Sequence, residues 1–209
     1  MAKIGLIGAG NIGGALARHF VAAGHQVAVS NSRGPETLSA LVTELGAGAR
    51  AVTPAQAAAF GDVVVVSVPL HRYREVPTEG LAGKPVIDTN NYYPQRDGQI
   101  AALDDDSTTS SELLAAHLSG AKVVKAFNQI AAANLAAEGT PAGTPDRTAI
   151  PIAGDDAAAK ATVAALIDGI GFDTVDVGGL ADTRILAPGA SLYVHVTAAQ
   201  ARAIIAGLG

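Results

Sequence analysis

The chain has 209 residues, of which 49% are hydrophobic, and a formal net charge of −5. It is long enough to bury one sizeable core but short for two full domains, and its negative charge argues against duplex nucleic acid or an anionic membrane surface as a main partner. The absence of cysteine excludes disulfides, thiolate metal sites and thiol nucleophiles. No apolar run approaches the roughly 20 residues that a membrane span needs, and a strand beginning at Lys3 leaves no room for a signal peptide, so we expect a cytoplasmic protein.

The first 30 residues predict a strand, a helix and a second strand. Lys3–Ile7 is short and apolar, as a buried parallel strand should be. An apolar residue at every fourth position from Ile12 to Phe20 gives one stripe of an amphipathic helix. Gly24 ends this helix, and Gln26–Ser30 predicts the second strand.

The same alternation continues over the next hundred residues. Asp62–Pro69 is the clearest buried strand, because it is β-branched and does not alternate with polar residues. The other expected elements are a helix over Pro35–Leu45, a strand over Ala49–Val52, a short helix from Pro54 that stops at Gly61, a strand over Pro85–Asp88, a helix over Ser110–Leu118 and a strand over Lys122–Phe127. This pattern predicts an α/β fold of the Rossmann type, a doubly wound and mainly parallel sheet with helices on both faces.

The C-terminal third predicts one more βαβ unit, which we expect to extend the same sheet. A loop rich in Gly, Pro and Thr over Glu138–Thr148 leads into it, and its elements are a strand over Ala149–Ala153, a helix over Asp155–Ile170 and a strand over Phe172–Val177. Asp155 and Asp156 suit the start of this helix as caps rather than as metal ligands. We therefore expect a single domain, with residues 1–137 as a dinucleotide-binding core and 149–209 as its extension. The tail ends in an apolar helix near Ala198–Ala206, which is compatible with a homodimer.

A glycine-rich turn follows the first strand. Gly8, Gly10 and Gly13 form a GxGxxG pattern, in which the first glycine permits the bend, the second lets backbone approach a pyrophosphate and the third lets helix pack on strand. The following helix would present its free N–H groups to that pyrophosphate. The alternative is a glycine bend with no ligand.

A second signal lies at the end of the second strand, where NAD-binding proteins usually place an acid against the ribose 2′-hydroxyl. Asn31 stands there instead, followed by Ser32 and Arg33. The missing acid removes repulsion against a 2′-phosphate, and the Arg33 guanidinium offers a planar donor fork to bind one. This turn favours NADP(H) over NAD(H). The alternative is a solvated turn that caps the next helix.

Other polar residues follow the remaining strands. Asn90 and Asn128 could hold a nicotinamide carboxamide or a second ligand, and turn chemistry explains them equally well. His71 and His195 are weak acid/base candidates. The chain lacks the short-chain dehydrogenase Tyr/Lys dyad and the GxxxxGK[ST], HExxH and GxSxG motifs. The lack of an evident acid/base pair favours hydride exchange between two redox cofactors, which needs mainly juxtaposed rings.

Five segments together resemble the NADPH:coenzyme F420 oxidoreductase-like family, over residues 1 to about 178. They are Gly8–Gly13, Ser30–Glu36, Asp88–Tyr93, Lys125–Asn128 and Pro151–Asp156. The resemblance implies pyrophosphate contacts by Gly10, Asn11 and Ile12, 2′-phosphate contacts by Ser32 and Arg33, and a nicotinamide bordered by Val68–Pro69 and Ala126–Phe127. It also implies hydride transfer between NADP(H) and the deazaflavin F420. F420 carries a phosphate and an acidic tail, for which the candidate basic partners are Arg72, Arg74, Arg96 and Lys125, unless these are simply solvated at the surface.

The leading hypothesis is therefore an NADP(H)-dependent oxidoreductase that exchanges hydride with F420 as co-substrate. The alternatives are an NADPH-dependent reductase of a small imine, carbonyl or other organic substrate, and a non-catalytic protein that senses NADP(H). No catalytic residue and no metal ligand are assigned. The predicted cofactor-binding residues are Gly8, Gly10, Asn11, Ile12, Gly13, Asn31, Ser32, Arg33, Val68, Pro69, Asn90 and Ala126.

Overall fold

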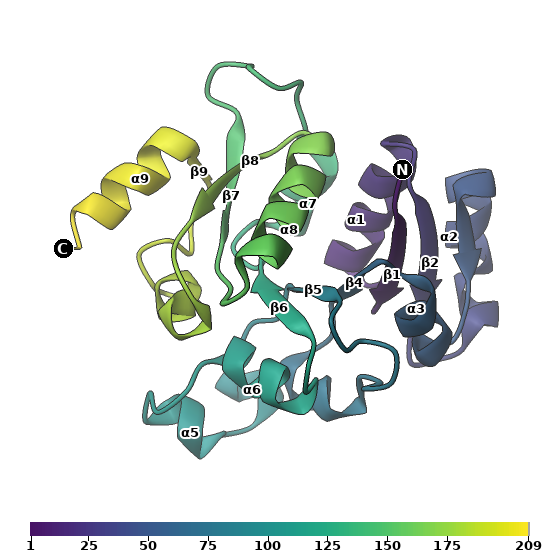
Figure 1. The fold of residues 1–209 in the computed structure, drawn as a ribbon, viewed down its shortest axis with the longest axis horizontal. Coiled ribbons are helices and arrows are strands. Elements are labelled where there is room, and N and C mark those ends of the chain that lie inside the picture. The colour runs from purple at the N-terminus through teal and green to yellow at the C-terminus, as the bar shows by residue number, and fades with distance from the viewer. Residues whose placement is uncertain (209) are drawn as a thin grey trace.

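The computed structural model, which describes residues 1–208, contains a large parallel sheet and a small mixed sheet (Figure 1). The large sheet has six strands in the order β3-β2-β1-β4-β5-β6, and every neighbouring pair is parallel. Its strands are β1 (Lys3–Ile7), β2 (Gln26–Ser30), β3 (Ala49–Ala51), β4 (Val63–Val66), β5 (Pro85–Asp88) and β6 (Lys122–Lys125). This is the Rossmann-type, doubly wound parallel sheet predicted from the sequence. The order reverses between β1 and β4, so the carboxyl ends of these strands flank the crevice where such sheets bind ligands.

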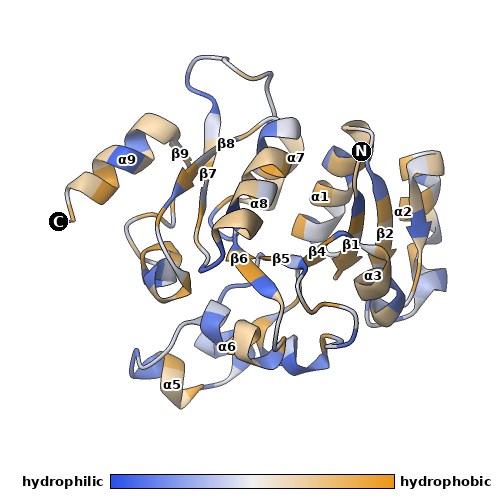
Figure 2. Ribbon diagram, viewed as in Figure 1, coloured by the Kyte–Doolittle hydropathy of each residue, from blue (hydrophilic) through white to orange (hydrophobic). Residues whose placement is uncertain are grey.

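Helices cover both faces of the large sheet. α1 (Asn11–Ala22), α7 (Ala132–Ala137) and α8 (Ala157–Gly169) pack on one face, and α3 (Pro54–Phe60), the 3-10 helix η3 (Leu70–Glu75) and α6 (Ser110–His117) pack on the other. The four valines of β4 divide between these faces, with Val63 and Val65 in one core cluster and Val64 and Val66 in the other. In Figure 2, orange hydrophobic residues run along the strands and the helices against them, whereas the loop before β7 is largely blue and white. A strand buried on both faces explains why β4 is continuously apolar.

Several element boundaries differ from the expected ones. The helix expected over Pro35–Leu45 is a 3-10 turn, η1 (Pro35–Leu38), followed by α2 (Ser39–Leu45), and β4 and β6 end earlier than predicted. The chain also forms short helices that the sequence pattern did not predict, namely η2 (Gly46–Gly48), α4 (Pro94–Asp97), α5 (Ala101–Asp104), η3 and α7.

The expected extension of the large sheet by the C-terminal βαβ unit is wrong. β7 (Thr148–Ile152), β8 (Asp173–Asp176) and β9 (Val196–Thr197) form a separate sheet in the order β8-β7-β9. β7 meets β6 only through one antiparallel bridge between Lys125 and Ala153. Along β7, Pro151 has no N–H to donate to a neighbouring strand, and Thr148 and Ala149 already pair with β9. β7 therefore offers β6 no continuous row of free backbone groups with which to pair.

The two sheets nevertheless share hydrophobic core. Ile150, Ile152 and Phe172 belong to the same buried cluster as Leu6 and Val124 of the large sheet. The tail forms the 3-10 helix η4 (Leu180–Leu186), strand β9 of the small sheet, and α9 (Ala198–Ala206), which lies at the outer edge of the molecule in Figure 1. Across residues 1–208, no helix is long and apolar enough to cross a membrane.

The two aspartates before α8 have different roles. Asp156 is the N-cap predicted, because its carboxylate accepts from the Ala159 N–H at 2.9 Å. Asp155 is not a cap of this helix: its Oδ1 accepts from the Leu180 N–H at 2.9 Å and holds the start of η4. The helix α8 is therefore capped by Asp156 alone, and the carboxylate of Asp155 binds the tail instead.

Candidate cofactor site

A cavity of about 380 Å³ lies at the carboxyl ends of β1, β2 and β4, in the crevice where the strand order reverses. Five segments line it: the turn after β1, the turn after β2, the start of α3 at Pro54, the segment after β4, and η3 with the residue that follows it. It brings together seven of the predicted residues, Gly8, Gly10, Asn31, Ser32, Arg33, Val68 and Pro69. A cavity of this size is typical of sites for cofactors and small ligands.

Each of the three glycines in the turn after β1 has different surroundings. Gly8 has a φ of 102°, and an added Cβ would lie 2.0 Å from the Ser67 carbonyl oxygen. At Gly13 it would lie 1.9 Å from the Gly8 carbonyl oxygen, so this glycine lets α1 pack tightly. At Gly10 it would meet nothing within 4 Å, and Gly10 lines the cavity. The backbone at Gly10 therefore forms an open cradle, which fits the close approach of a pyrophosphate.

The turn after β2 is shaped by Asn31. Its Oδ1 accepts from the Arg33 N–H at 2.9 Å, and its Nδ2 donates to Thr37 Oγ1 at 2.8 Å. Both side-chain groups therefore bond within the turn, as the alternative interpretation expected. The exposed Arg33 guanidinium has no hydrogen-bond or ion-pair partner among residues 1–208. The turn thus presents an unpaired cation at the cavity, with no carboxylate at the Asn31 position to oppose an anion.

A second guanidinium reaches this turn from η3. Arg72 Nη1 donates to Ser32 Oγ at 3.1 Å, while its other nitrogens pair with the Glu75 carboxylate at 2.5 to 3.0 Å. The hydrogen bond from Arg72 lowers the pKa of Glu75 below its usual range, so this carboxylate is ionised. Arg72 and Glu75 both line the cavity. From the sequence, Arg72 is a candidate partner for F420 or a solvated surface residue, and its contact with Ser32 was not predicted.

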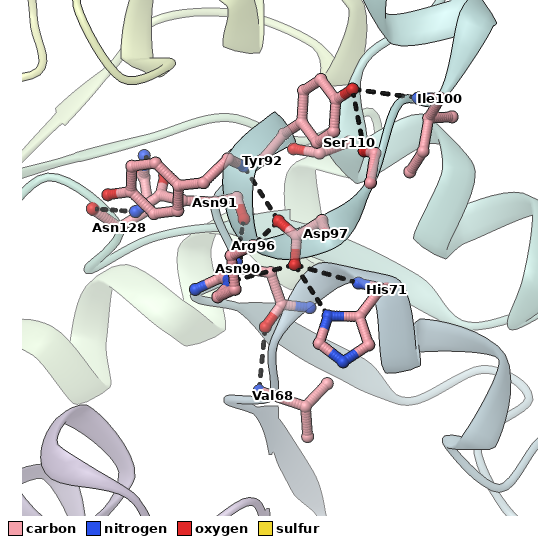
Figure 3. A network of polar contacts seen from close by, with 12 residues as sticks. Val68, His71, Asn90, Asn91, Tyr92, Arg96, Asp97, Ile100, Ser110 and Asn128 are labelled. Carbon is pink, nitrogen blue, oxygen red and sulfur yellow. Dashed lines mark hydrogen bonds and ion pairs between the residues drawn. The ribbon is translucent and has the colours of Figure 1, made fainter.

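The remaining predicted residues lie outside the cavity lining. Asn11, Ile12 and Gly13 form the first residues of α1. Ala126 directly follows β6 and is fully buried, and its N–H donates to the carbonyl of Asp88 at the end of β5 at 3.0 Å. Asn90 is buried, and its Oδ1 accepts from the Val68 N–H at 3.0 Å, which fixes the segment after β4 (Figure 3). Its Nδ2 is buried without a partner among residues 1–208.

A buried ion pair holds the turn after β5. Lys125 Nζ donates to Asp88 Oδ2 at 3.0 Å and to the Asn90 carbonyl, and both side chains are at most 2% exposed. Ser111 Oγ donates to the same carboxylate at 2.7 Å, and the Asn90 N–H donates to its other oxygen at 2.9 Å. With its carboxylate and ammonium satisfied internally, this pair positions Asn90. Lys125 is therefore a structural residue and not a solvated partner for an acidic tail.

The tail covers the ends of β5 and β6. Asn128 Nδ2 donates to the Leu186 carbonyl at 2.7 Å and to Asn91 Oδ1 at 3.0 Å. The hydroxyl of Tyr193 lies 2.5 Å from that of Tyr93. Burial and the hydrogen bond with Tyr93 raise the pKa of Tyr193 to about 12, so this phenol is protonated at neutral pH. These contacts join the residues 186–193 to the edge of the crevice beside β5.

A histidine–aspartate pair lies just beyond Pro69. His71 Nδ1 is 2.9 Å from Asp97 Oδ1, and Figure 3 shows Asp97 between His71 and Arg96. Burial opposes ionisation of Asp97, but hydrogen bonds from Arg96, the Tyr93 N–H and His71 outweigh it and hold the pKa of Asp97 well below its usual range. The carboxylate fixes Nδ1 of the ring, and Nε2 has no partner among residues 1–208. From the sequence alone His71 is a weak acid/base candidate, and its pairing with Asp97 was not predicted because the two residues are 26 positions apart.

The outcome for the other histidine candidate is different. His195 Nε2 lies 2.9 Å from Glu138 Oε2 and 3.3 Å from Thr148 Oγ1, in the small sheet rather than at the cavity. It therefore joins the loop before β7 to the tail.

Comparison with known proteins places the chain in a family. The model for "NADP oxidoreductase coenzyme F420-dependent" matches residues 3–92, which hold all the segments that line the cavity. A hypothetical protein of Sinorhizobium meliloti, SMa0349, is 34% identical, with a TM-score of 0.82 over 94% of this chain and 96% of that one. A structure from Arthrobacter sp. FB24, described as a "putative f420 dependent nadp-reductase", is 27% identical, with a TM-score of 0.74 over 88% of each chain.

A longer relative is the rat metalloreductase STEAP3, which is 31% identical over 185 residues. The match covers 87% of this chain but 35% of that protein, so the chain spans about a third of its length. The family model covers the segments that line the cavity, and the similarity to SMa0349 extends over nearly the whole fold. This chain belongs to the family of NADP-dependent oxidoreductases described as coenzyme F420-dependent.

Proposed function

We propose that this protein transfers a hydride between NADP(H), bound in the cavity after β1, β2 and β4, and the deazaflavin F420. The observation that carries the cofactor half is the pairing of an open glycine cradle with an unpaired Arg33 in one cavity. The F420 half rests on the family model over residues 3–92 and on the relative from Arthrobacter. The chemistry that the nicotinamide supplies is hydride donation and acceptance.

The protein's own part is to bind and orient. The Gly10 backbone and the start of α1, with Asn11 and Ile12, would hold the pyrophosphate, and Ser32 and Arg33 would hold the 2′-phosphate. Val68 and Pro69, fixed by Asn90, would border the nicotinamide ribose and ring. Ala126 would support the site without contacting the cofactor, because it is fully buried at the strand ends.

The position of the second substrate follows from the tail. Residues 186–193 contact the segments that follow β5 and β6, so a tricyclic ring that occupied the space over these strand ends would displace the contacts of Tyr193 with Tyr93 and Asn91. Arg96 supports an acidic ligand here, because its guanidinium is exposed and lies 4.9 Å from the Tyr93 ring. Arg96 is also held by Asp97, so it is already positioned.

The direct test is to mix the purified protein with NADPH and F420 and to follow the absorbance of both cofactors. We expect NADPH oxidation matched by F420 reduction, and little reaction with NADH. No change at either absorbance, in a sample where NADPH binding is measured independently, would exclude F420 as the acceptor.

A second candidate function is the reduction of a small imine or carbonyl, and the pair of His71 and Asp97 favours it. Such a reduction needs a proton donor, and a histidine oriented by a buried carboxylate is a common one. The ring follows two residues after Pro69, which lines the cavity, and its side chain is 43% exposed. A small substrate would also need less displacement of the tail.

Replacing His71 separates the two functions. Hydride exchange between two cofactors should be nearly unchanged in His71→Gln, whereas imine or carbonyl reduction should fall by about 100-fold, within the usual range for a lost general acid. His195→Gln is the matched control, since His195 also pairs with a carboxylate, that of Glu138, but does not line the cavity. Turnover of a panel of imines and carbonyls with NADPH, without F420, would establish the second function and displace the first.

A further inference from the structure

We propose that Arg72 is a second phosphate-binding residue of the cofactor site, and that Glu75 is the partner it leaves when the 2′-phosphate of NADP(H) binds. The inference deepens the proposed function, because it rests on NADP(H) occupying the cavity, but it does not depend on the identity of the hydride acceptor. It also places Arg72 on the adenosine side of the site, whereas the sequence offered it as a partner for F420 or as a solvated surface residue.

The position of Arg72 is the first argument. Its guanidinium reaches across the cavity from η3 and donates to Ser32 Oγ, in the turn that also carries Arg33. These two arginines come from segments 39 residues apart in the chain and meet at the same turn. A phosphate that accepts from Ser32 and Arg33 would therefore lie within reach of Arg72 as well, and guanidinium groups are well suited to phosphate oxygens.

The second argument is the geometry of η3. A 3-10 helix has three residues per turn, so Arg72 and Glu75 share one face, and both line the cavity. Arg74 lies on another face, where its guanidinium is 5.1 Å from the Tyr73 ring, and it does not line the cavity. The helix therefore presents one of its two arginines to the cofactor site.

The third argument concerns Glu75. Its carboxylate accepts from Nε and Nη2 of Arg72, and its side chain is 60% exposed. A carboxylate in this position repels a phosphate dianion while it holds the arginine. Exposed ion pairs are weak, so a phosphate with more charge can take over the guanidinium at small cost. Glu75 thus acts as an internal competitor that lowers the affinity for the 2′-phosphate.

Binding of 2′,5′-ADP and of 5′-AMP measures this interaction without any redox reaction, because the two nucleotides differ by the 2′-phosphate alone. For Arg72→Ala we expect about a 10-fold loss of affinity for 2′,5′-ADP, as for a partly exposed charge-assisted contact, and no change for 5′-AMP. Arg74→Ala, which removes the same charge from the same helix, should leave both affinities unchanged.

Glu75→Gln tests the competition. Removing this charge frees the guanidinium and should tighten 2′,5′-ADP binding by about 2- to 5-fold. Equal effects of Arg72→Ala and Arg74→Ala would overturn the role of Arg72, and unchanged or weaker binding in Glu75→Gln would overturn the role of Glu75. If Arg33→Ala also leaves 2′,5′-ADP binding intact, the fault lies in the placement of the 2′-phosphate itself. Failure of the F420 assay has no bearing on these measurements.

Discussion

At the scale of single residues, we propose that Arg33 sets the preference for NADP(H) over NAD(H). Its guanidinium has no partner within residues 1–208, so little is lost from the fold when it is removed. For Arg33→Ala we expect NADPH affinity to fall by about 10- to 100-fold, as for a lost charge-assisted hydrogen bond, with NADH affinity nearly unchanged. Calorimetric titration with both nucleotides measures this.

Arg50→Ala is the control, because Arg50 stacks 4.0 Å over Phe60, away from the cavity. NADPH binding in Arg33→Ala that equals the wild-type value would contradict the assignment of Arg33.

Gly10 and Gly13 make a matched pair of residues, since both belong to the same motif but differ in their surroundings. Gly10 lines the cavity and an alanine Cβ there would meet nothing within 4 Å, whereas at Gly13 it would meet the Gly8 carbonyl oxygen. We expect Gly10→Ala to keep the wild-type melting temperature and to lose NADPH affinity by about 10-fold or more, because the methyl group occupies the cradle. Gly13→Ala should instead lower the melting temperature, because α1 must shift. Thermal melts with and without NADPH distinguish the two variants. NADPH binding in Gly10→Ala that equals the wild-type value would show that the pyrophosphate does not bind at this turn.

Single residues were predictable where the signal is local. The bend at Gly8 and the acid-free turn at Asn31 are short motifs with one physical reason each, and the structure has both at the cavity. The contact of Arg72 with Ser32 was not predicted, because it joins positions 40 residues apart and leaves no periodic trace. Lys125 was assigned to the surface for the same reason, since its partner Asp88 lies on another strand.

At the scale of elements, Asp97 fastens α4 to η3, and this link should make the stability depend on pH. Its pKa in the folded protein lies well below its ordinary value, with Arg96, His71 and the Tyr93 N–H facing it. The lowered pKa stabilises the fold fully above the unfolded value of about 4, and this contribution is lost as the pH falls toward the folded value.

Urea unfolding of the wild type and of Asp97→Asn measures this contribution. The difference in free energy of unfolding between them should be largest near neutral pH and should shrink below about pH 5. Asp146→Asn, which changes an exposed carboxylate in the loop before β7, should show no such trend. A constant difference between the wild type and Asp97→Asn across the acid range would mean that the carboxylate is not what fastens α4.

Helices and strands were predictable where the element is long enough to show a hydrophobic pattern and where a separate sequence signal marks its end. β2 and α9 have the predicted bounds, because each combines a clear pattern with an end signal in the sequence. α7 has six residues, and its N-cap makes no side-chain hydrogen bond, so it forms because Leu135 is buried against α1 and the large sheet. β9 has two residues and exists only through its pairing with β7. Such elements depend on tertiary contacts and carry no local signal.

For the whole molecule, the two sheets have one core between them although they are almost separate in hydrogen bonding. Phe172, at the start of the small sheet, is fully buried and lies edge-to-face with His19 of α1 at 5.6 Å between ring centroids. This packing has a consequence for folding, because a core that is shared across two sheets couples their stabilities. We therefore propose that residues 1–137 and 149–209 unfold as one unit.

Phe172→Ala should lower the free energy of unfolding by about 3–5 kcal/mol, the usual cost of emptying a large aromatic site in a core. Because we expect a single unfolding unit, far-UV circular dichroism and tyrosine fluorescence should report one coincident transition in both the wild type and Phe172→Ala.

A nucleotide bound at the cavity after β1 should also stabilise the distant small sheet. At 100 times the dissociation constant, NADP⁺ should slow amide exchange in β7 and β8 by an amount equivalent to about 2.7 kcal/mol, as mass action requires. Protection confined to the large sheet, or a separate transition for β7 and β8, would show that the C-terminal unit folds independently despite its shared core.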